Sequence, residues 1–164
     1  MEIIKDITKV NRSIVKDKKN EYIVIHYVGS VSSAKNNGAY FRDVNRNASA
    51  HYFVDSENIV QVVEDLDASW HCGALQYKHR QCRNINSIGI EICCYKDFSD
   101  GGICKMLPLA IKKAKELTKE LAMKYNIPKE NILRHYDVTG KSCPMEWSVE
   151  NCKEWEEFKE GIYE

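Results

Sequence analysis

The sequence has no excess of charge of either sign and no long hydrophobic segment. It contains 24 Lys and Arg residues against 24 Asp and Glu residues, and aromatic residues make up 10% of its 164 positions. This balance suggests neither the basic surface typical of nucleic-acid-binding proteins nor a disordered chain. No apolar run approaches the roughly 20 residues that span a bilayer. We therefore expect no nucleic-acid partner and no insertion into a membrane.

The first 20 residues, MEIIKDITKVNRSIVKDKKN, lack the continuous hydrophobic region of a secretory signal peptide, because Lys and Asp interrupt the apolar patches. The 7 cysteines are an odd number, and they show neither a Cys-x-x-Cys pair nor a zinc-finger spacing. Both absences favour synthesis in a reducing cytoplasm. No repeat, linker or low-complexity tract divides the chain. We expect residues 1–164 to form one monomeric domain with one core and one site.

Runs of β-branched and aromatic residues predict the strands of this domain. The run EYIVIHYV at residues 21–28 is typical of a strand that is buried on both faces, and SIGIEICCY at 87–95 predicts another strand. Two strand-like runs within 49–65 surround turn residues and predict a hairpin. ILRH at 132–135 predicts a further short strand. The polar segment 68–87 has no clear period and is predicted to be a long loop, which in a compact domain is often functional.

Helical spacing predicts three helices between and after these strands. The segment 107–128 is the clearest, with Pro108 suited to its first turn. Its expected apolar stripe is Leu109, Ala110, Ala114, Leu117, Leu121 and Ala122. A short helix is expected within 29–47, with Ala39, Tyr40, Phe41 and Val44 at near-helical spacing, and Ser148 is the expected cap of a closing helix in 147–160. Strands separated by helices predict an α/β fold with a mixed central sheet flanked by helices.

Two histidines and one cysteine are candidates for a metal site. His26 lies near the end of one predicted strand and His135 at the end of another, so both can project into one cleft. Cys143 follows the turn TGKSC, which can fold it back beside His135. Two imidazoles and one thiolate suit zinc, and three protein ligands with an open fourth position are typical of a catalytic site. From spacing alone, two alternatives stay open: Cys143 as a small buried apolar side chain, or as a nucleophile with His135 as its base.

Glu91 and Lys141 are candidates for acid–base and electrostatic roles. Glu91 places a carboxylate inside the otherwise apolar strand SIGIEICC, where an unpaired charge is costly. In a zinc hydrolase it would be the general base, and a strand-end ion pair or an edge position facing solvent is the alternative. Lys141 can offer its ammonium group to an oxyanion. The alternative is a solvated lysine in a turn.

Four sequence blocks together resemble a known family. They are, in the order of that family, VIHYVGS, SAHYFVDSENIVQVVEDLDASWHCGA, NINSIGIEICC and RHYDVTGKSCP. The blocks resemble the zinc-dependent N-acetylmuramoyl-L-alanine amidases of the type 2 family, and the resemblance covers about residues 20–147. This family includes phage endolysins, bacterial autolysins, the anhydro-muramyl amidases of wall recycling and the animal peptidoglycan-recognition proteins.

The resemblance implies a metal site, a reaction and a partner. One Zn²⁺ per chain would be bound by His26, His135 and Cys143, with Glu91 as the base and Lys141 stabilising the transition state. The segment SWHCG is similar to the family's WHAG block, which implies that Trp70 and His71 line the substrate groove. The implied reaction is hydrolysis of the amide that joins the lactyl group of N-acetylmuramic acid to L-alanine in peptidoglycan. The loop at residues 68–86 is expected to set the preference for the stem peptide.

The biological role that follows is degradation of a bacterial cell wall by a bacteriolytic, antimicrobial enzyme, either a phage or prophage endolysin or an autolysin. Such a protein would be made in the cytoplasm and reach the wall after holin-type release. We expect residues 1–164 to be a catalytic domain without a wall-binding domain. The alternative is a recognition module that holds peptidoglycan without cutting it, although such relatives are expected to lack the cysteine that this chain has at Cys143.

The chain also departs from the family pattern. Ala50 stands where some members carry a catalytic tyrosine, so the role of base rests on Glu91. Cys143 stands where the recycling enzymes have aspartate, which favours the lysin and recognition-protein branches. His51 and His79 are expected to be structural or solvated. Cys93 and Cys94 should point to opposite faces of their strand, as one core thiol and one surface thiol.

Overall fold

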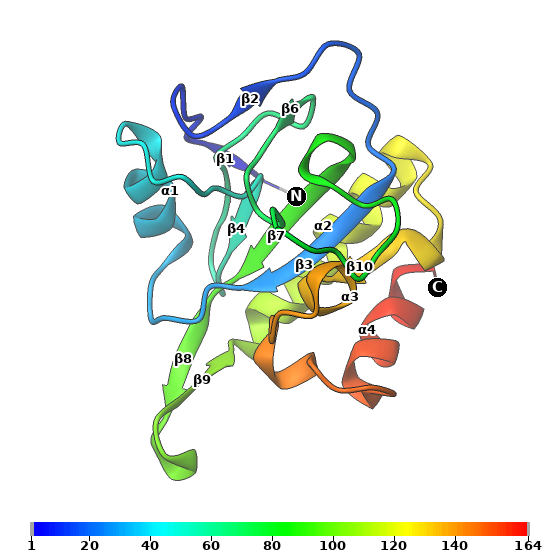
Figure 1. Ribbon diagram of the computed structural model, residues 1–164. Helices are drawn as coiled ribbons and strands as arrows, with labels where there is room; N and C mark the ends of the chain where they lie inside the picture. The colour runs from blue at the N-terminus through cyan, green and yellow to red at the C-terminus, as the bar shows by residue number, and fades with distance from the viewer. Residues whose placement is uncertain (1, 164) are drawn as a thin grey trace.

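A six-stranded mixed sheet lies at the centre of the computed structural model, which describes residues 2–163 (Figure 1). The strand order is β1-β5-β4-β7-β3-β10. The strands are β1 (Ile4–Lys5), β3 (Tyr22–Tyr27), β4 (Tyr52–Val54), β5 (Ile59–Gln61), β7 (Ser87–Ile92) and β10 (Ile132–Arg134). β4 and β5 are antiparallel to each other, and the other neighbours run parallel. The predicted mixed sheet and the hairpin at 49–65 are confirmed. The short strand predicted for 132–135 is confirmed over Ile132–Arg134 and wrong at its end, because His135 begins a helix.

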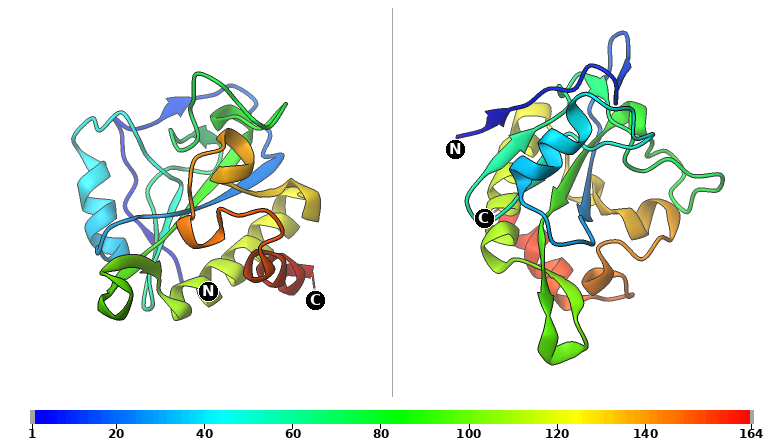
Figure 2. Two further views of the ribbon diagram at one scale, coloured as in Figure 1. Left: turned by 60° about the horizontal axis from the view of Figure 1, so that its bottom comes forward. Right: turned by 90° about the vertical axis from the view of Figure 1, so that its left-hand side faces the viewer.

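Two small antiparallel pairs flank this sheet. β2 (Ser13–Ile14) pairs with β6 (Asp67–Ala68), and β8 (Cys94–Asp97) pairs with β9 (Ile103–Met106). The β8–β9 hairpin projects from the body of the molecule (Figure 2). Because β7 ends at Ile92, the single strand predicted for 87–95 is wrong at its end: the chain leaves the central sheet at Cys93 and enters the hairpin.

The helices lie on both sides of the sheet. They are α1 (Ala34–Arg42), α2 (Pro108–Tyr125), α3 (His135–Thr139) and α4 (Lys153–Tyr163), and short 3₁₀ turns occur at Asn84–Asn86, Phe98–Asp100, Lys129–Asn131 and Met145–Trp147. α2 and α4 pack against one face of the sheet, and α1 packs against β4 and β5 from the other (Figure 2). None of the helices within residues 2–163 is long and apolar enough to cross a membrane.

The alternation of side chains along the central strands separates the core from the site. Ile23 and Ile25 of β3 and Ile90 of β7 point into the core beneath α2 and α4. Successive side chains of a strand point to opposite faces. His26 and Glu91 therefore lie on the face that α2 and α4 leave uncovered.

Three details of the predicted helices are wrong. In α1 the buried residues are Ala34, Asn37 and Gly38, whereas Tyr40 and Val44 of the predicted stripe are exposed. A Cβ at position 38 would lie 2.9 Å from a Val60 methyl group, so the helix approaches β5 through its small residues. In α2, Leu109 is exposed although the rest of the predicted stripe is buried. α4 begins at Lys153 rather than after Ser148, whose hydroxyl instead donates to the Pro144 carbonyl.

The cysteines are free thiols within the described residues, and all but Cys104 are buried. Cys93 and Cys94 point into different hydrophobic clusters, as their adjacent positions predicted. The prediction that one of them is a surface thiol is wrong. Cys94 is buried because α2 and the β8–β9 hairpin cover that edge of the core.

Asp65 connects the end of the hairpin to α2 through a buried hydrogen-bond network. Its carboxylate accepts hydrogen bonds from Tyr52 (2.5 Å), Gln61 (3.2 Å), Lys124 (2.8 Å) and Tyr125 (2.6 Å). Burial acts to raise the pKa of this carboxyl group, but the hydrogen bonds from Lys124 and the two tyrosines outweigh burial and hold the pKa below its usual value. The folded state therefore favours the ionised form of Asp65.

Replacing Asp65 with asparagine is expected to lower the free energy of unfolding at pH 7 by about 2 kcal/mol, because the new amide group turns a donor toward Lys124 and Tyr125. A lowered carboxyl pKa stabilises the fold above the unfolded value, and this contribution is lost as the pH falls below about 4. Asp65→Asn should thus flatten the acid limb of a denaturant-unfolding series. The exposed Asp43→Asn serves as the control. Equal acid dependence in Asp65→Asn and the wild type would contradict this role.

Candidate metal centre and active site

The register of the central strands places His26 beside Glu91. The two residues are directly paired between β3 and β7, and paired side chains project from the same face of a sheet. His26 Nδ1 lies 4.0 Å from Glu91 Oε1. Burial lowers the pKa of His26 well below its usual value, so this contact joins a neutral imidazole to the carboxyl group and is not an ion pair.

His135 and Cys143 approach His26 from the chain that follows β10. Arg134, the last residue of β10, pairs with Ile25, so His135 begins α3 beside His26 with their ring centroids 4.6 Å apart. α3 ends at Thr139, and the φ of +82° at Gly140 reverses the chain and returns Cys143 toward β3.

Hydrogen bonds hold this returning segment in place. The backbone N–H of Tyr136 donates to the Cys143 carbonyl at 2.9 Å. The buried guanidinium group of Arg134 donates to the carboxylate of Asp137 and to the carbonyl groups of Trp147 and Val149. α3 and the segment that carries Cys143 are thus fixed to the end of β10.

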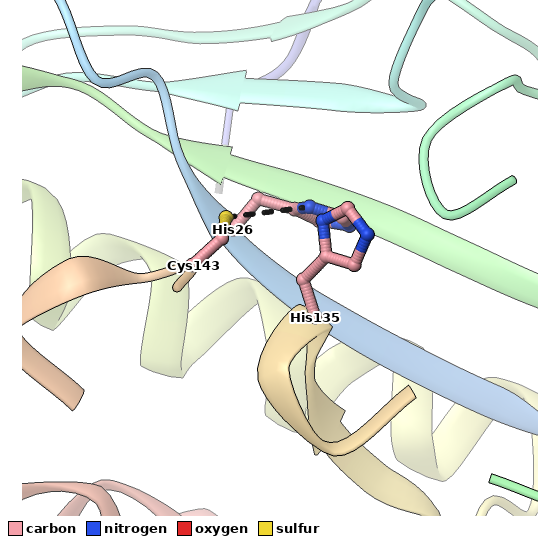
Figure 3. A group of neighbouring side chains, drawn as sticks. All are labelled: His26, His135 and Cys143. Atoms are coloured by element: carbon pink, nitrogen blue, oxygen red, sulfur yellow. Dashed lines mark hydrogen bonds between the residues drawn. The ribbon is translucent and has the colours of Figure 1, made fainter. Parts of the chain in front are cut away.

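The three candidate ligands converge on one point. One ligand atom from each of His26, His135 and Cys143 lies within 4.8 Å of the other two, and all three residues are buried (Figure 3). Cys143 Sγ is 3.8 Å from His26 Nδ1. Within residues 2–163 these residues form the only group of His, Cys, Asp and Glu side chains with this geometry. The structure therefore brings together the three ligands expected from the sequence.

The donor atoms are two imidazole nitrogens and one thiol sulfur, which are ligands that Zn²⁺ prefers. Metal-bound histidine must be neutral and cysteine must be a thiolate. Burial, with Lys141 second, lowers the pKa of His135 to about 4. His135 Nδ1 is buried and has no hydrogen-bond partner within the described residues. Burial raises the pKa of the Cys143 thiol to about 12, with Glu91 adding to the effect. A thiol in this position ionises readily only when a cation lies against it.

Glu91 is the acidic side chain that lines the same cleft as these candidate ligands. Burial raises the pKa of Glu91 to about 8, and the positive charge of Lys141 partly opposes that rise. Glu91 Oε2 is buried without a hydrogen-bond partner among residues 2–163. A carboxyl group with a pKa near neutrality and a free oxygen facing a cleft can both accept and return a proton. The ion pair that was the structural alternative for Glu91 is absent from the described part of the chain.

A cleft of about 340 Å³ opens above the candidate ligands, and all the site residues predicted from the sequence line it. Its lining includes His26, Trp70, His71, Glu91, His135, Lys141 and Cys143. A second hollow shares Trp70, His71, His135 and Lys141 with it, and a third shares Phe41, Phe53 and Glu91. The candidate ligands thus lie in the middle of a longer groove. Lys141 is exposed to this groove.

Trp70 and His71 lie differently in this groove. The indole N–H of Trp70 donates to the Ser13 hydroxyl at 2.9 Å, so its ring lies along the wall of the groove. His71 is only 8% exposed, and both of its ring nitrogens lie within hydrogen-bond distance of other side chains, His26 and Ser87. The roles of Trp70 and His71 toward substrate stay predictions.

The other histidines belong to the scaffold, as expected. His51 is fully buried, and its Nδ1 accepts a hydrogen bond from the backbone N–H of Gly89. His79 Nδ1 accepts hydrogen bonds from the backbone N–H groups of Gln81 and Cys82 and thereby shapes the loop after β6.

Sequence reasoning missed Ser87 and Gly89, which occupy the same face of β7 as Glu91. A Cβ at position 89 would lie 2.6 Å from Cγ of His71, so only glycine leaves room for that ring. The signal was present in the sequence, since a glycine inside a strand often marks the close approach of another group.

Comparison with known proteins gives the family. Residues 16–146 match the N-acetylmuramoyl-L-alanine amidase family, Amidase_2. A probable N-acetylmuramoyl-L-alanine amidase of Bacillus licheniformis is 31% identical over 163 residues, which cover 90% of this chain and 43% of the relative. The structure of PlyL is 27% identical, with a TM-score of 0.80 over 99% of this chain and 97% of PlyL. The catalytic domain of XlyA is 27% identical, with a TM-score of 0.76 over 99% of both chains.

These similarities agree with the span of about 20–147 over which the four sequence blocks resemble the type 2 amidases. They also confirm the predicted α/β fold. The chain spans less than half the length of the curated relatives it matches. On the match over residues 16–146, the chain belongs to the N-acetylmuramoyl-L-alanine amidase family.

Proposed function

We propose that this protein is a zinc-dependent peptidoglycan hydrolase that cleaves the amide bond between N-acetylmuramic acid and L-alanine of the stem peptide. The observation that carries this proposal is the convergence of His26, His135 and Cys143 beside the buried Glu91 in one cleft. Relatives named as N-acetylmuramoyl-L-alanine amidases support the choice of substrate.

The proposed role of each group follows from its chemistry. A Zn²⁺ ion held by His26, His135 and Cys143 would supply an activated water and polarise the carbonyl group of the substrate. Glu91 accepts the proton of the attacking water and then returns it to the departing nitrogen of L-alanine. Burial raises the pKa of Glu91 in the metal-free protein, and positive charge beside it, such as that of Lys141, lowers the pKa toward the ionised form that accepts the proton. The hydrolysis products are the free lactyl carboxylate on the sugar and a peptide with a free amino group.

The geometry argues against Cys143 as a nucleophile with His135 as its base. Cys143 Sγ lies within hydrogen-bond distance of a His26 nitrogen, at 3.8 Å, and makes no such contact with His135 within the described residues. Burial raises the pKa of the Cys143 thiol and lowers that of His135, so neither group is prepared to exchange a proton with the other. Activated cysteine nucleophiles have the opposite shift, a lowered thiol pKa.

Lys141 is proposed to stabilise the oxyanion that forms as water attacks. Its ammonium group lies at the mouth of the cleft and raises the local positive potential at His26, His135 and Glu91. Lys141→Met is expected to lower kcat about 100-fold, because it removes one charged donor from the transition state. Zinc affinity should change less than about threefold, since Lys141 is not a ligand.

The measurement for Lys141 is steady-state hydrolysis together with a zinc competition titration. Lys153→Met, which removes an exposed lysine of α4, is the matched control and should behave as the wild type. A Lys141→Met enzyme with wild-type kcat would show that this lysine is only a solvated turn residue.

The proposed bond specificity can be tested with a soluble N-acetylmuramoyl peptide in ¹⁸O-labelled water. The zinc-loaded protein should release the peptide with a free L-alanine amino group and place the ¹⁸O label in the lactyl carboxylate of the sugar. Label found in the peptide, or a peptide that stays attached to the sugar, would count against an amidase. Mass spectrometry of the two fragments distinguishes these outcomes.

We further propose that residues 1–164 act as one catalytic domain, in support of which 99% of the chain aligns with the XlyA catalytic domain. Action on the bacterial cell wall accords with the names of the relatives. The monomeric state and holin-type release from the cytoplasm stay predictions, and so does the identity of the protein as an endolysin or autolysin.

A further inference from the structure

A chain of hydrogen bonds runs from Ser87, the first residue of β7, to the candidate ligand His26. His71 lies between the two, with Nδ1 2.9 Å from His26 Nε2 and Nε2 2.9 Å from Ser87 Oγ. Ser87 and His71 are both buried. The hydrogen bond made by Ser87, at the end of the chain away from His26, determines which atom carries each proton.

The outer end is the Ser87 hydroxyl group, which donates its single hydrogen to the Arg83 carbonyl at 2.6 Å. Ser87 Oγ must therefore act as the acceptor toward His71, so the His71 proton lies on Nε2. In a neutral imidazole one nitrogen donates and the other accepts. Nδ1 of His71 is thus an acceptor, and His26 donates to it from Nε2.

This order of protons leaves Nδ1 of His26 without a hydrogen. Nδ1 is the atom that faces the cleft, 3.8 Å from Cys143 Sγ and 4.0 Å from Glu91 Oε1. In the other tautomer of His26, a hydrogen on Nδ1 would point at these groups and no lone pair would be available there. The tautomer of His26 is therefore decided by His71 and, through it, by Ser87.

The position of the His71 ring is fixed as tightly as its protons. Gly89 leaves the space that the ring fills, since a Cβ there would lie 2.6 Å from Cγ and 2.8 Å from Nδ1 of His71. The side-chain oxygen of Asn84 accepts hydrogen bonds from the backbone N–H groups of His71 (3.2 Å) and Cys72 (2.9 Å). The rings of His71 and His26 meet edge to face at 83°. β7 thus provides the proton acceptor Ser87 and the space at Gly89 on the face that also carries Glu91.

We propose that His71 is a positioning residue for the metal ligand His26, and that the relay from Ser87 through His71 keeps Nδ1 of His26 free to bind zinc. This inference rests on the proposed zinc function, and it assigns His71 a role behind the metal site, in addition to its place in the groove wall. Groups that orient a metal-bound histidine in this way typically change metal affinity 10- to 100-fold when removed.

The first test is a zinc competition titration against a fluorescent chelator at fixed pH. His71→Ala should weaken zinc binding about 10- to 100-fold, and Ser87→Ala about 10-fold, because His71 can then change tautomer. His71→Asn keeps an acceptor oxygen where Nδ1 lies and should bind zinc within about threefold of the wild type. His79→Asn, in the same loop but outside the relay, is the matched control.

The second test reads the tautomer directly in the zinc-free protein. Long-range ¹H–¹⁵N NMR of the histidine rings should show the wild-type His26 proton on Nε2, and Ser87→Ala should place part of it on Nδ1. A merely structural role for His71 would not move this signal. The midpoint of thermal unfolding of each zinc-free variant separates lost affinity from lost folding, and Ser87→Ala with His71→Asn still tests the relay if His71→Ala fails to fold.

The results separate this inference from the proposed function. The relay alone would be overturned if the wild type and His71→Ala bound zinc equally tightly. It would also be overturned if the wild-type His26 proton lay on Nδ1. A wild-type protein that binds no zinc would overturn the proposed metal function. It would also overturn the role of the relay, which depends on zinc binding. Rescue by His71→Asn together with the NMR signature would establish the positioning role.

Discussion

Glu91→Gln should lower kcat about 10³-fold while zinc stays bound, because general acid–base catalysis typically contributes 10²- to 10⁴-fold. Glutamine keeps the size and the hydrogen-bonding oxygen of the side chain but cannot accept a proton from water. Glu91 has a buried, unpartnered oxygen and a pKa raised to about 8 by burial. Removing its titrating group should therefore also raise the stability of the zinc-free fold slightly, or leave it unchanged. Steady-state kinetics and the zinc content of the purified variant measure the first two effects.

A second carboxyl group gives the matched control for Glu91. Burial also raises the pKa of Glu146, whose side chain accepts a hydrogen bond from the backbone N–H of Met106. Glu146→Gln keeps this acceptor and should retain kcat within about threefold, because Glu146 does not line the cleft. A Glu91→Gln enzyme with full activity would refute Glu91 as the base. Loss of zinc in that variant would instead indicate a role in the metal site.

Cys143→Ala should abolish hydrolysis and lower zinc affinity by more than the roughly 10- to 100-fold that is typical of residues that only orient a ligand. The change removes one of three donors and leaves His26 and His135 as an incomplete set. Cys143→Asp should recover part of the zinc binding and of the activity, since a carboxylate oxygen is also a ligand for zinc. A nucleophilic cysteine would not be replaced by aspartate in this way.

Cys104→Ala is the matched control for Cys143, because Cys104 lies on the β8–β9 hairpin away from the cleft. It should bind zinc and turn over substrate as the wild type does. A Cys143→Ala protein that still binds one zinc ion tightly would contradict Cys143 as a ligand. An active Cys143→Ala protein would contradict both the ligand and the nucleophile interpretations.

The central strands and the main site residues could be predicted because local signals agree with the final fold. β3 and β7 are long apolar runs, and the polar residues His26 and Glu91 interrupt them at positions where an unpaired polar group would otherwise be costly. The α1 stripe could not be predicted in the same way. Its buried face consists of small and polar residues, because the helix lies too close to β5 for larger ones, and its large residue Tyr40 faces solvent.

The relay behind His26 could not be predicted from the chain because it depends on register and on proton positions. His71 and Ser87 are separated by a long loop and meet only because that loop folds back over β7. The direction of the hydrogen bonds is set by the Arg83 carbonyl, and a backbone group leaves no trace in a side-chain pattern. The prediction that Ser148 caps a helix is wrong for a related reason. Its hydroxyl group donates to the Pro144 carbonyl and does not accept a hydrogen bond from the first turn of a helix.

The most direct test of the central claim is digestion of purified peptidoglycan by the metal-stripped protein, with and without added zinc. The assay scores newly freed L-alanine amino groups against newly freed reducing sugars. The account predicts that amino groups appear only after zinc is restored and that reducing ends do not appear. Release of amino groups without zinc, or of reducing ends in their place, would contradict it. A wall that is bound but uncut in both samples would identify a recognition module and would contradict the proposed hydrolysis.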